Sequence, residues 1–169
     1  DHRGEDGPPL AAVADHLATH GWQLRYGGTK MFSDHSADGS GAAAALEKAT
    51  RELLRRIATL QAPTTLQRAP SQNKTSDLPP GISGPILRQR SGSGLREASL
   101  SVLIPRFGEK PRRRTVYIGT ENTYTLQKYE AALARAIQMR QEAEAAYQRD
   151  VTRAKRAEGR KLKAERKTG

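Results

Sequence analysis

The sequence contains no cysteine and few aromatic residues, and each shortage excludes a class of structure. Without cysteine, disulfides and thiolate zinc sites are unavailable, which is typical of proteins from a reducing cytosol. Aromatic residues make up 5% of the 169 residues and hydrophobic residues 36%, which limits the apolar surface that the chain can bury. The composition therefore predicts one or two small domains, with part of the chain left unpacked.

Long hydrophobic runs are also missing. The longest apolar stretch is far shorter than the roughly 20 residues that a membrane helix needs, and no signal-peptide pattern opens the chain. We therefore expect a cytoplasmic, nucleoid-associated protein with no membrane partner. The chain does not begin with Met, which indicates a processed protein or a fragment of a longer one.

Net charge is absent from the first part of the chain and concentrated in the second. Residues 1–80 hold 9 Lys+Arg and 9 Asp+Glu, whereas residues 81–169 hold 20 and 9, so the whole net charge of +11 lies in the second part. Residues 149–169 alone hold 9 Lys+Arg and 3 Asp+Glu. Basic clusters attract phosphate through counterion release, which gives affinity without sequence preference. The charge distribution therefore favours a nucleic-acid partner for the second part.

The second part also carries a strand pattern followed by a helix pattern. Turn residues at 92–94 and 108–111 separate three predicted strands, at residues 82–90, 98–105 and 112–119. Apolar residues then recur with a helical period from about residue 125 to 147. A sheet of three strands buries one face, and this helix has the pattern needed to cover it. The other face is left to solvent or to a partner.

Strand alternation predicts which side chains point away from that helix. In the second strand, the core set is Leu100, Val102 and Ile104, and the outward set is Ser99, Ser101 and Leu103. In the third strand, the core set is Val116 and Ile118, and the outward set is Arg113, Thr115 and Tyr117. In the first strand, Arg88 and Arg90 share the parity of Ile86, so they join the outward set only if that strand bends or frays.

The first part of the chain predicts a related module. Pro8 and Pro9 open a predicted helix over residues 8–20, two short strands at 22–26 and 30–33 flank a hairpin turn at Gly27 and Gly28, and a second helix covers 41–60. Strands followed by an alanine-rich helix thus occur twice, as a weak internal repeat.

The predicted fold is α+β, with a three-stranded antiparallel sheet packed on one helix and a second copy of that module before it. The predicted domains are 1–61, a Pro-rich linker at 62–80, the sheet-and-helix module at 81–148 and a basic helical or disordered arm at 149–169.

Three short motifs carry a family resemblance. They are Gly-Ile-Ser at 81–83, Ala-Ser-Leu-Ser-Val at 98–102, and Thr-Val-Tyr-Ile-Gly-Thr at 115–120 before an alanine-rich helix. Residues 81–148 thereby resemble the Apetala-type, or ethylene-response-factor-like, DNA-binding domain, in the divergent form found in bacterial and phage proteins, and residues 22–60 resemble a degenerate second copy. The resemblance implies a three-stranded sheet laid into the DNA major groove with a helix packed behind it. It places Tyr117 at an aromatic contact to base and sugar, with Arg113 and Thr115 on the same strand face.

These features predict a double-stranded DNA-binding protein, a sequence-preferring regulator of transcription or of a mobile element that reads the major groove with a β-sheet. The residues expected to contact DNA are Arg88, Arg90, Ser99, Ser101, Arg106, Lys110, Arg112, Arg113, Arg114, Thr115 and Tyr117. One alternative is the arm-type DNA-binding portion of an integrase, and another is an RNA-binding or protein-interaction factor. The helices predicted at 8–20 and 41–60 also suggest a homodimer surface.

Catalysis has little support in the sequence. The histidines are His2, His16, His20 and His35. The i, i+4 spacing of His16 and His20 suits a metal on a helix, but no acidic third ligand stands near them, so we interpret them as surface residues. The glycines around Ser40 lack the lysine of a phosphate-binding loop and indicate a flexible connection. We therefore expect no enzymatic activity, no metal and no cofactor.

Overall fold

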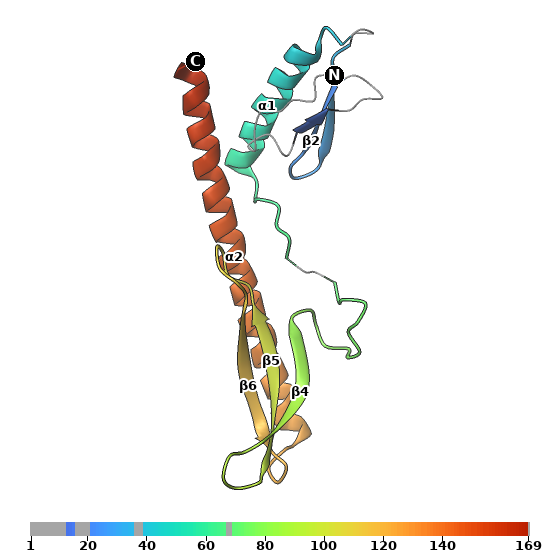
Figure 1. Ribbon diagram of the computed structural model, residues 1–169, viewed down its shortest axis with the longest axis vertical. Helices are drawn as coiled ribbons and strands as arrows, with labels where there is room; N and C mark the ends of the chain where they lie inside the picture. The colour runs from blue at the N-terminus through green and yellow to red at the C-terminus, as the bar shows by residue number, and fades with distance from the viewer. Residues whose placement is uncertain (1–12, 16–20, 36–38, 67–68, 169) are drawn as a thin grey trace. The chain divides into compact units, whose positions relative to one another are not determined.

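The computed structural model has an α+β fold, as the sequence predicted. It describes residues 13–15, 21–35, 39–66 and 69–168. The chain forms two compact units: the first comprises residues 1–64 with 149–169, and the second comprises residues 65–148. Each unit contains a three-stranded antiparallel sheet (Figure 1).

The second unit is built on the three strands that alternation predicted. They are β4 (Ile82–Gln89), β5 (Arg96–Ile104) and β6 (Arg112–Thr120), hydrogen-bonded in the order β4-β5-β6. The helix α2 (Leu126–Thr168) follows directly, and Figure 1 shows its first part against one face of this sheet. Thr125 accepts a hydrogen bond from the backbone N–H of Lys128 at 3.1 Å, which satisfies one of the free amide groups at the helix start.

The core of the second unit confirms the predicted inward set. Leu100 and Val102 have no exposed surface, and Val116 and Ile118 are also buried. Small helix residues, Ala132 and Ala136, meet them from α2 and allow the helix to approach the sheet closely. Burying each such aliphatic side chain contributes about 2 kcal/mol. The packed face of the sheet is therefore the face toward α2.

The helix α2 runs about 20 residues beyond its predicted end near residue 147, reaching Thr168. The basic tail is thus helical and not a disordered arm. Residues 149–168 contain no proline and consist mainly of good helix formers, so the single Gly159 does not interrupt them. Ion pairs one turn apart, such as Lys155 with Glu158 at 3.6 Å, add a little support on the exposed surface.

The first unit contains the predicted hairpin and helix. The strands β2 (Gly21–Arg25) and β3 (Thr29–Ser33) pair across a turn in which Gly27 and Gly28 both have positive φ, and α1 (Ala42–Thr59) follows. A third strand, β1 (Val13–Asp15), pairs antiparallel with β2. The prediction of a helix over residues 8–20 is therefore wrong at 13–15, because pairing with β2 outweighs the local helical spacing; its remaining residues lie outside the described ones.

The core of the first unit joins β2 to α1. The buried side chains are Leu24, Tyr26, Ala49, Leu53, Ile57 and Ala62, and Val151 of α2 packs against them. The Trp22 indole donates a hydrogen bond to the Ala42 carbonyl at 3.0 Å, which fixes the start of α1 over the hairpin. Each three-stranded sheet therefore has one helix packed on it, as the predicted α+β fold with two sheet-and-helix modules requires.

Arg56 fastens α1 to the hairpin turn. Its Nη1 donates to the Tyr26 and Gly28 carbonyls, each at 2.9 Å, and its Nε donates to Glu52 at 3.0 Å. Hydrogen bonds from Arg55, and then from Arg56, hold the pKa of Glu52 at about 2. Glu52 is therefore ionised throughout the physiological range and keeps both guanidinium groups oriented.

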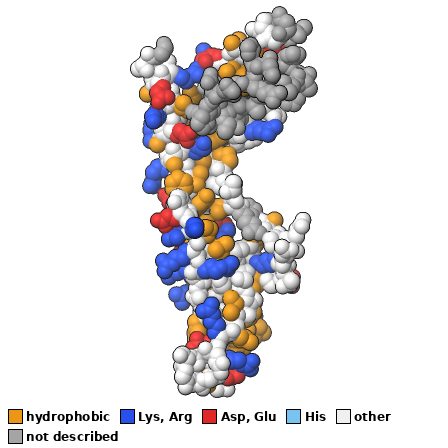
Figure 2. Space-filling model, in the orientation of Figure 1, with side chains coloured by type: hydrophobic (Ala, Val, Ile, Leu, Met, Phe, Trp, Pro, Cys, Tyr) orange, Lys and Arg blue, Asp and Glu red, His pale blue; other side chains and the backbone are white. Residues whose placement is uncertain are grey.

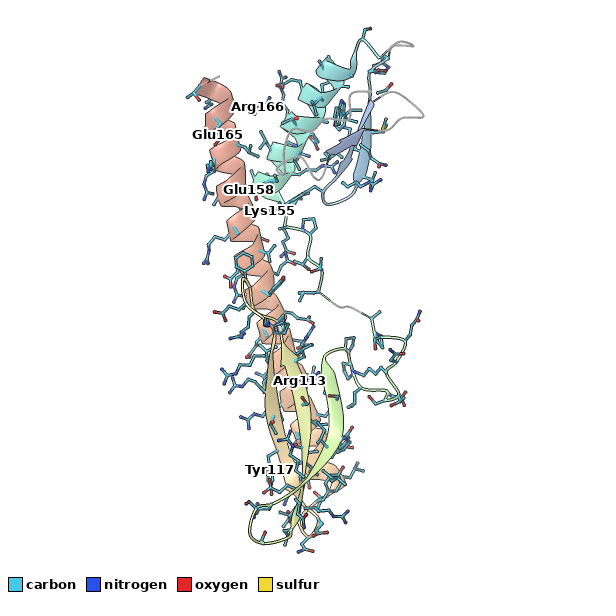
Figure 3. All side chains as sticks on the ribbon, viewed as in Figure 1. Arg113, Tyr117, Lys155, Glu158, Glu165 and Arg166 are labelled. Atoms are coloured by element: carbon cyan, nitrogen blue, oxygen red, sulfur yellow. The ribbon has the colours of Figure 1, made fainter. Side chains whose placement is uncertain are left out.

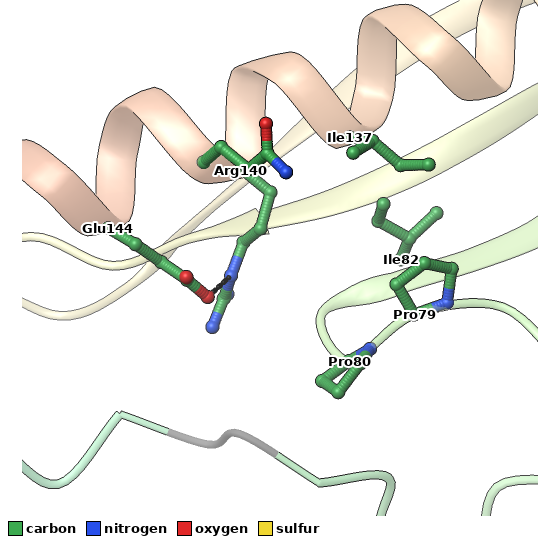
Figure 4. A pocket seen from close by; sticks show the side chains of 7 residues that line it. Pro79, Pro80, Ile82, Ile137, Arg140 and Glu144 are labelled. Carbon is green, nitrogen blue, oxygen red and sulfur yellow. Dashed lines mark hydrogen bonds and ion pairs between the residues drawn. The ribbon is translucent and has the colours of Figure 1, made fainter.

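Arg140 performs a similar role in the second unit. Its side chain is 8% exposed, and it donates to the Glu144 carboxylate at 2.8 Å and to the Leu103 carbonyl. Figure 4 shows the ion pair beside a small pocket of about 200 Å³ at the start of β4. Gly81 borders the guanidinium so closely that a Cβ there would stand 2.6 Å from Nη1. Arg140 therefore ties α2 to the end of β5, and Gly81 leaves it room.

Replacing Arg140 with methionine should lower the free energy of unfolding by about 2 kcal/mol, because the Leu103 carbonyl and the Glu144 carboxylate lose a charged donor. Arg135→Met is the matched control, since Arg135 is an exposed arginine on the same helix; it should change the unfolding free energy by less than about 0.5 kcal/mol. Urea denaturation of both variants measures the difference. Equal losses in the two variants would contradict the role assigned to Arg140.

Candidate nucleic-acid interface

The face of the second-unit sheet that points away from α2 is here called the open face. In an antiparallel pair, residues directly opposite each other point to the same side of the sheet. The residues that alternate with the core positions of β5 and β6 therefore lie on the open face. The register pairs Ser99 with Tyr117, Ser101 with Thr115, and Leu103 with Arg113. The outward sets predicted for both strands thus share one surface.

Tyr117 lies at the end of the open face next to the β4–β5 hairpin, and its side chain is 53% exposed (Figure 3). Arg90, just beyond β4, forms an ion pair with Glu97. The pKa of Arg90 is raised. The main cause is its hydrogen bond to Glu97, and the nearby Tyr117 hydroxyl contributes a smaller part. Arg90, Glu97 and Tyr117 therefore form one cluster, in which the Tyr117 hydroxyl lies near the Arg90 guanidinium.

Arg113 lies toward the opposite end of the same strand and is exposed. Its Nη1 donates a hydrogen bond to the Ser101 hydroxyl at 3.3 Å. Ser101 was predicted as a direct contact, but it is only 8% exposed. In the structure Ser101 orients Arg113. Between Arg113 and Tyr117 on the open face, Thr115 is exposed and Ser99 is half-buried.

Arg88 reaches the open face through an irregularity in β4. The pairing shifts register between Ser83 and Ile86, so that Ser83 faces Ser101 while Ile86 faces Ser99. Both residues thereby lie on the open face although their numbers differ in parity, and Arg88, opposite Glu97, follows Ile86. The register shift thus provides the irregularity without which Arg88 would face the core, and Arg88 is exposed.

The other predicted cations lie around this face. Arg114 and Arg112 are opposite Val102 and Ile104, so they share the side of the sheet that α2 covers, yet both are exposed because β6 is an edge strand. Of the arginine triplet, only Arg113 is on the open face.

The loop between β5 and β6 carries the remaining two. Arg106 is paired with Glu109 at 2.8 Å and donates to the Lys110 carbonyl at 2.9 Å, while the Lys110 side chain is exposed. Phe107 packs edge-on against Tyr147 of α2, with ring centroids 6.3 Å apart, which holds the loop in place. The loop cations therefore lie at the Arg113 end of the sheet, and Figure 2 shows Lys and Arg side chains over the viewed surface of this unit.

Three members of the open face, Ser83, Ile86 and Glu97, were not among the outward residues predicted from sequence. Glu97 was outside the predicted strand, which began at residue 98, whereas β5 begins at Arg96. Extending the alternation of Ser99 and Ser101 back by two residues would have found it. Ile86 was not detectable, because only the register shift turns it outward.

The described residues show no arrangement suited to metal chemistry. Within 13–15, 21–35, 39–66 and 69–168, no three His, Asp or Glu side chains gather at metal-binding distance. His35 is the one histidine in these ranges; His2, His16 and His20 lie outside them. Neither described helix is both long and apolar enough to pass through a bilayer.

No protein-family model, curated protein or solved structure matches this chain. The function is therefore inferred from its own residues.

Proposed function

We propose that the chain binds double-stranded DNA by placing the open face of β4-β5-β6 in the major groove. The observation that carries this proposal is an uncovered sheet face with Arg113, Thr115 and Tyr117 in a row on its edge strand, and with Arg88 opposite Glu97 on the other edge strand. The resemblance to the Apetala-type domain supports the same arrangement. The protein acts as a binding factor and not as an enzyme.

The dimensions of the sheet suit that groove. Adjacent strands are about 4.8 Å apart, so the backbones of three strands span about 10 Å. The major groove of B-DNA is about 12 Å wide and admits elements of this size. The helix α2 covers the opposite face of the sheet and braces it, so the strands enter the groove as a rigid unit.

The side chains divide into two roles. Arg113, held by Ser101, and Tyr117 with Arg90 point from the open face toward base edges, where an arginine pairs with the two acceptors of guanine. Arg106 and Lys110, in the loop at one end of that face, and Arg112 and Arg114, on the other side of its edge strand, hold phosphates, which fixes the position of the sheet along the duplex. Ser99 and Thr115 are short hydroxyl contacts that adapt to several bases, and Arg88 adds a cation at the edge. This division fits a sequence-preferring regulator of transcription or of a mobile element.

Competition between duplexes tests the choice of nucleic acid. Duplex DNA should displace a bound DNA probe at least about tenfold better than duplex RNA of the same sequence at the same salt, because the A-form major groove is too narrow to admit the sheet. The Arg113→Ala/Tyr117→Ala variant should lose most of that preference. Equal competition by RNA would instead indicate binding by charge or by RNA shape and would overturn the proposal.

A further inference from the structure

The first unit contains a strongly basic cleft between α1 and the C-terminal part of α2. Its volume is about 740 Å³, and of its twelve lining residues seven are Lys or Arg and none is Asp or Glu. Arg51 and Arg55 contribute from α1, and the other five cations come from α2. We propose that this cleft is a second nucleic-acid site, which binds the phosphodiester backbone.

The cations of α2 form a stripe along one side of the helix. Arg156, Arg160, Lys163 and Lys167 follow one another at i, i+4, i+7 and i+11, and all four line the cleft. At 1.5 Å per residue the stripe is about 16 Å long. A linear array of positive charge of this kind is complementary to a chain of phosphates, and less so to a compact anion.

The positive charges of the stripe are not neutralised by acidic side chains of the described residues. On the α1 side, Arg51 pairs with Glu47 at 3.2 Å, and Arg166 of α2, which is labelled in Figure 3, reaches the same carboxylate. The four stripe cations form no ion pair with any acid in the part of the chain that the structure describes. In addition, Nε of Arg156 is buried and has no hydrogen-bond acceptor among those residues. An anion entering the cleft would relieve the repulsion among these groups and supply acceptors to them.

The apolar lining of the cleft indicates why phosphate is favoured over an amphipathic helix. Leu54, Ile57 and Ala58 all come from α1, whereas α2 contributes only cations and Gly159. Gly159 lies so close to α1 that a Cβ there would stand 2.8 Å from Cγ2 of Ile57, so the two helices are in contact at this point of the cleft. A helix docks its apolar face into a groove that is hydrophobic on both walls, and this cleft has one such wall. The guanidinium groups on the other wall match the bidentate geometry of phosphate oxygens.

The salt dependence of DNA binding tests this site. The double variant Arg160→Gln/Lys163→Gln removes two stripe cations, and Lys155→Gln/Lys161→Gln removes the same charge from positions on α2 that do not line the cleft. Affinity for a duplex of arbitrary sequence is measured by fluorescence anisotropy over a range of KCl concentrations. Each lost phosphate contact reduces the slope of log K against log salt by about 0.9, so the cleft variant should lose about 1.8 from the slope and the control less than half of that.

Equal slopes for the two variants, or an unchanged slope for the cleft variant, would overturn the site and would leave an acidic protein as the remaining partner for this surface. Circular dichroism melting confirms that both variants keep their fold. The result is separable from the fate of the open-face proposal, because Arg113→Ala/Tyr117→Ala tests sequence preference, whereas the cleft variant changes affinity for any sequence. Either site can fail while the other stands.

Discussion

The Arg113→Ala/Tyr117→Ala variant is expected to lose about 10- to 100-fold in the ratio of specific to non-specific DNA affinity. A well-placed side-chain contact to a base edge discriminates by about 1–3 kcal/mol, and Arg113 is preoriented by its hydrogen bond to Ser101. Tyr117 adds an exposed ring on the same face. The cognate duplex comes from selection out of a random pool, and both affinities are measured at one fixed salt concentration.

Arg112→Ala/Arg114→Ala is the matched control. It removes two arginines from the same strand, but from the side of the sheet that α2 covers. Its effect should be a uniform loss of affinity for all duplexes with the specificity ratio unchanged, because phosphate contacts carry no sequence information. If the two double variants changed the ratio equally, the assignment of Arg113 and Tyr117 to base contacts would be wrong.

The second large effect is expected on stability. Leu100→Ala should lower the free energy of unfolding of the second unit by about 3 kcal/mol, because a leucine with no exposed surface is removed from the centre of β5 and leaves a cavity. Small domains are stable by about 5–15 kcal/mol in total, so this change alone should shift the urea midpoint substantially. Far-ultraviolet circular dichroism follows the transition.

Leu87→Ala is the comparison for that experiment. Leu87 belongs to the same sheet but is 60% exposed, so truncating it should cost less than about 0.5 kcal/mol. A loss for Leu100→Ala no larger than that for Leu87→Ala would show that Leu100 does not lie in a packed core. The assignment of the open face would then fail with it.

The parts of this fold that could be predicted from sequence are those set by local pattern. Alternation along β5 and β6 identified the core residues Leu100 and Val116, and the pair Gly27 and Gly28 identified the β2–β3 hairpin, because each signal is contained within a few residues. The same alternation placed Arg113 and Tyr117 on one face of the sheet.

The parts that could not be predicted depend on residues distant in the chain. The strand β1 has three residues and forms through its pairing with β2, so no pattern in the neighbouring sequence predicts it. The shift between Ser83 and Ile86 is a property of the ladder with β5 and moves Arg88 to the open face. The basic cleft exists because α1 meets residues about a hundred positions later, and the sequence shows only two separate basic helices.

The burial of Ser101 illustrates a further limit of local pattern. Parity correctly placed its side chain on the open face, but the hydroxyl is covered and accepts a hydrogen bond from Arg113. Alternation indicates which side of the sheet a residue occupies and not how much of it a longer neighbour covers. For the site, the consequence is that Ser101 controls the direction of Arg113 and is removed from the residues expected to contact DNA directly.

A nuclear magnetic resonance titration of the isotope-labelled chain with the selected duplex tests the central claim most directly. The open-face account predicts the largest chemical-shift changes at Ser99, Thr115 and Tyr117 and at the guanidinium group of Arg113, with small changes in the stretch of α2 that covers the other face. Changes confined to α2 and absent from β5 and β6 would contradict it.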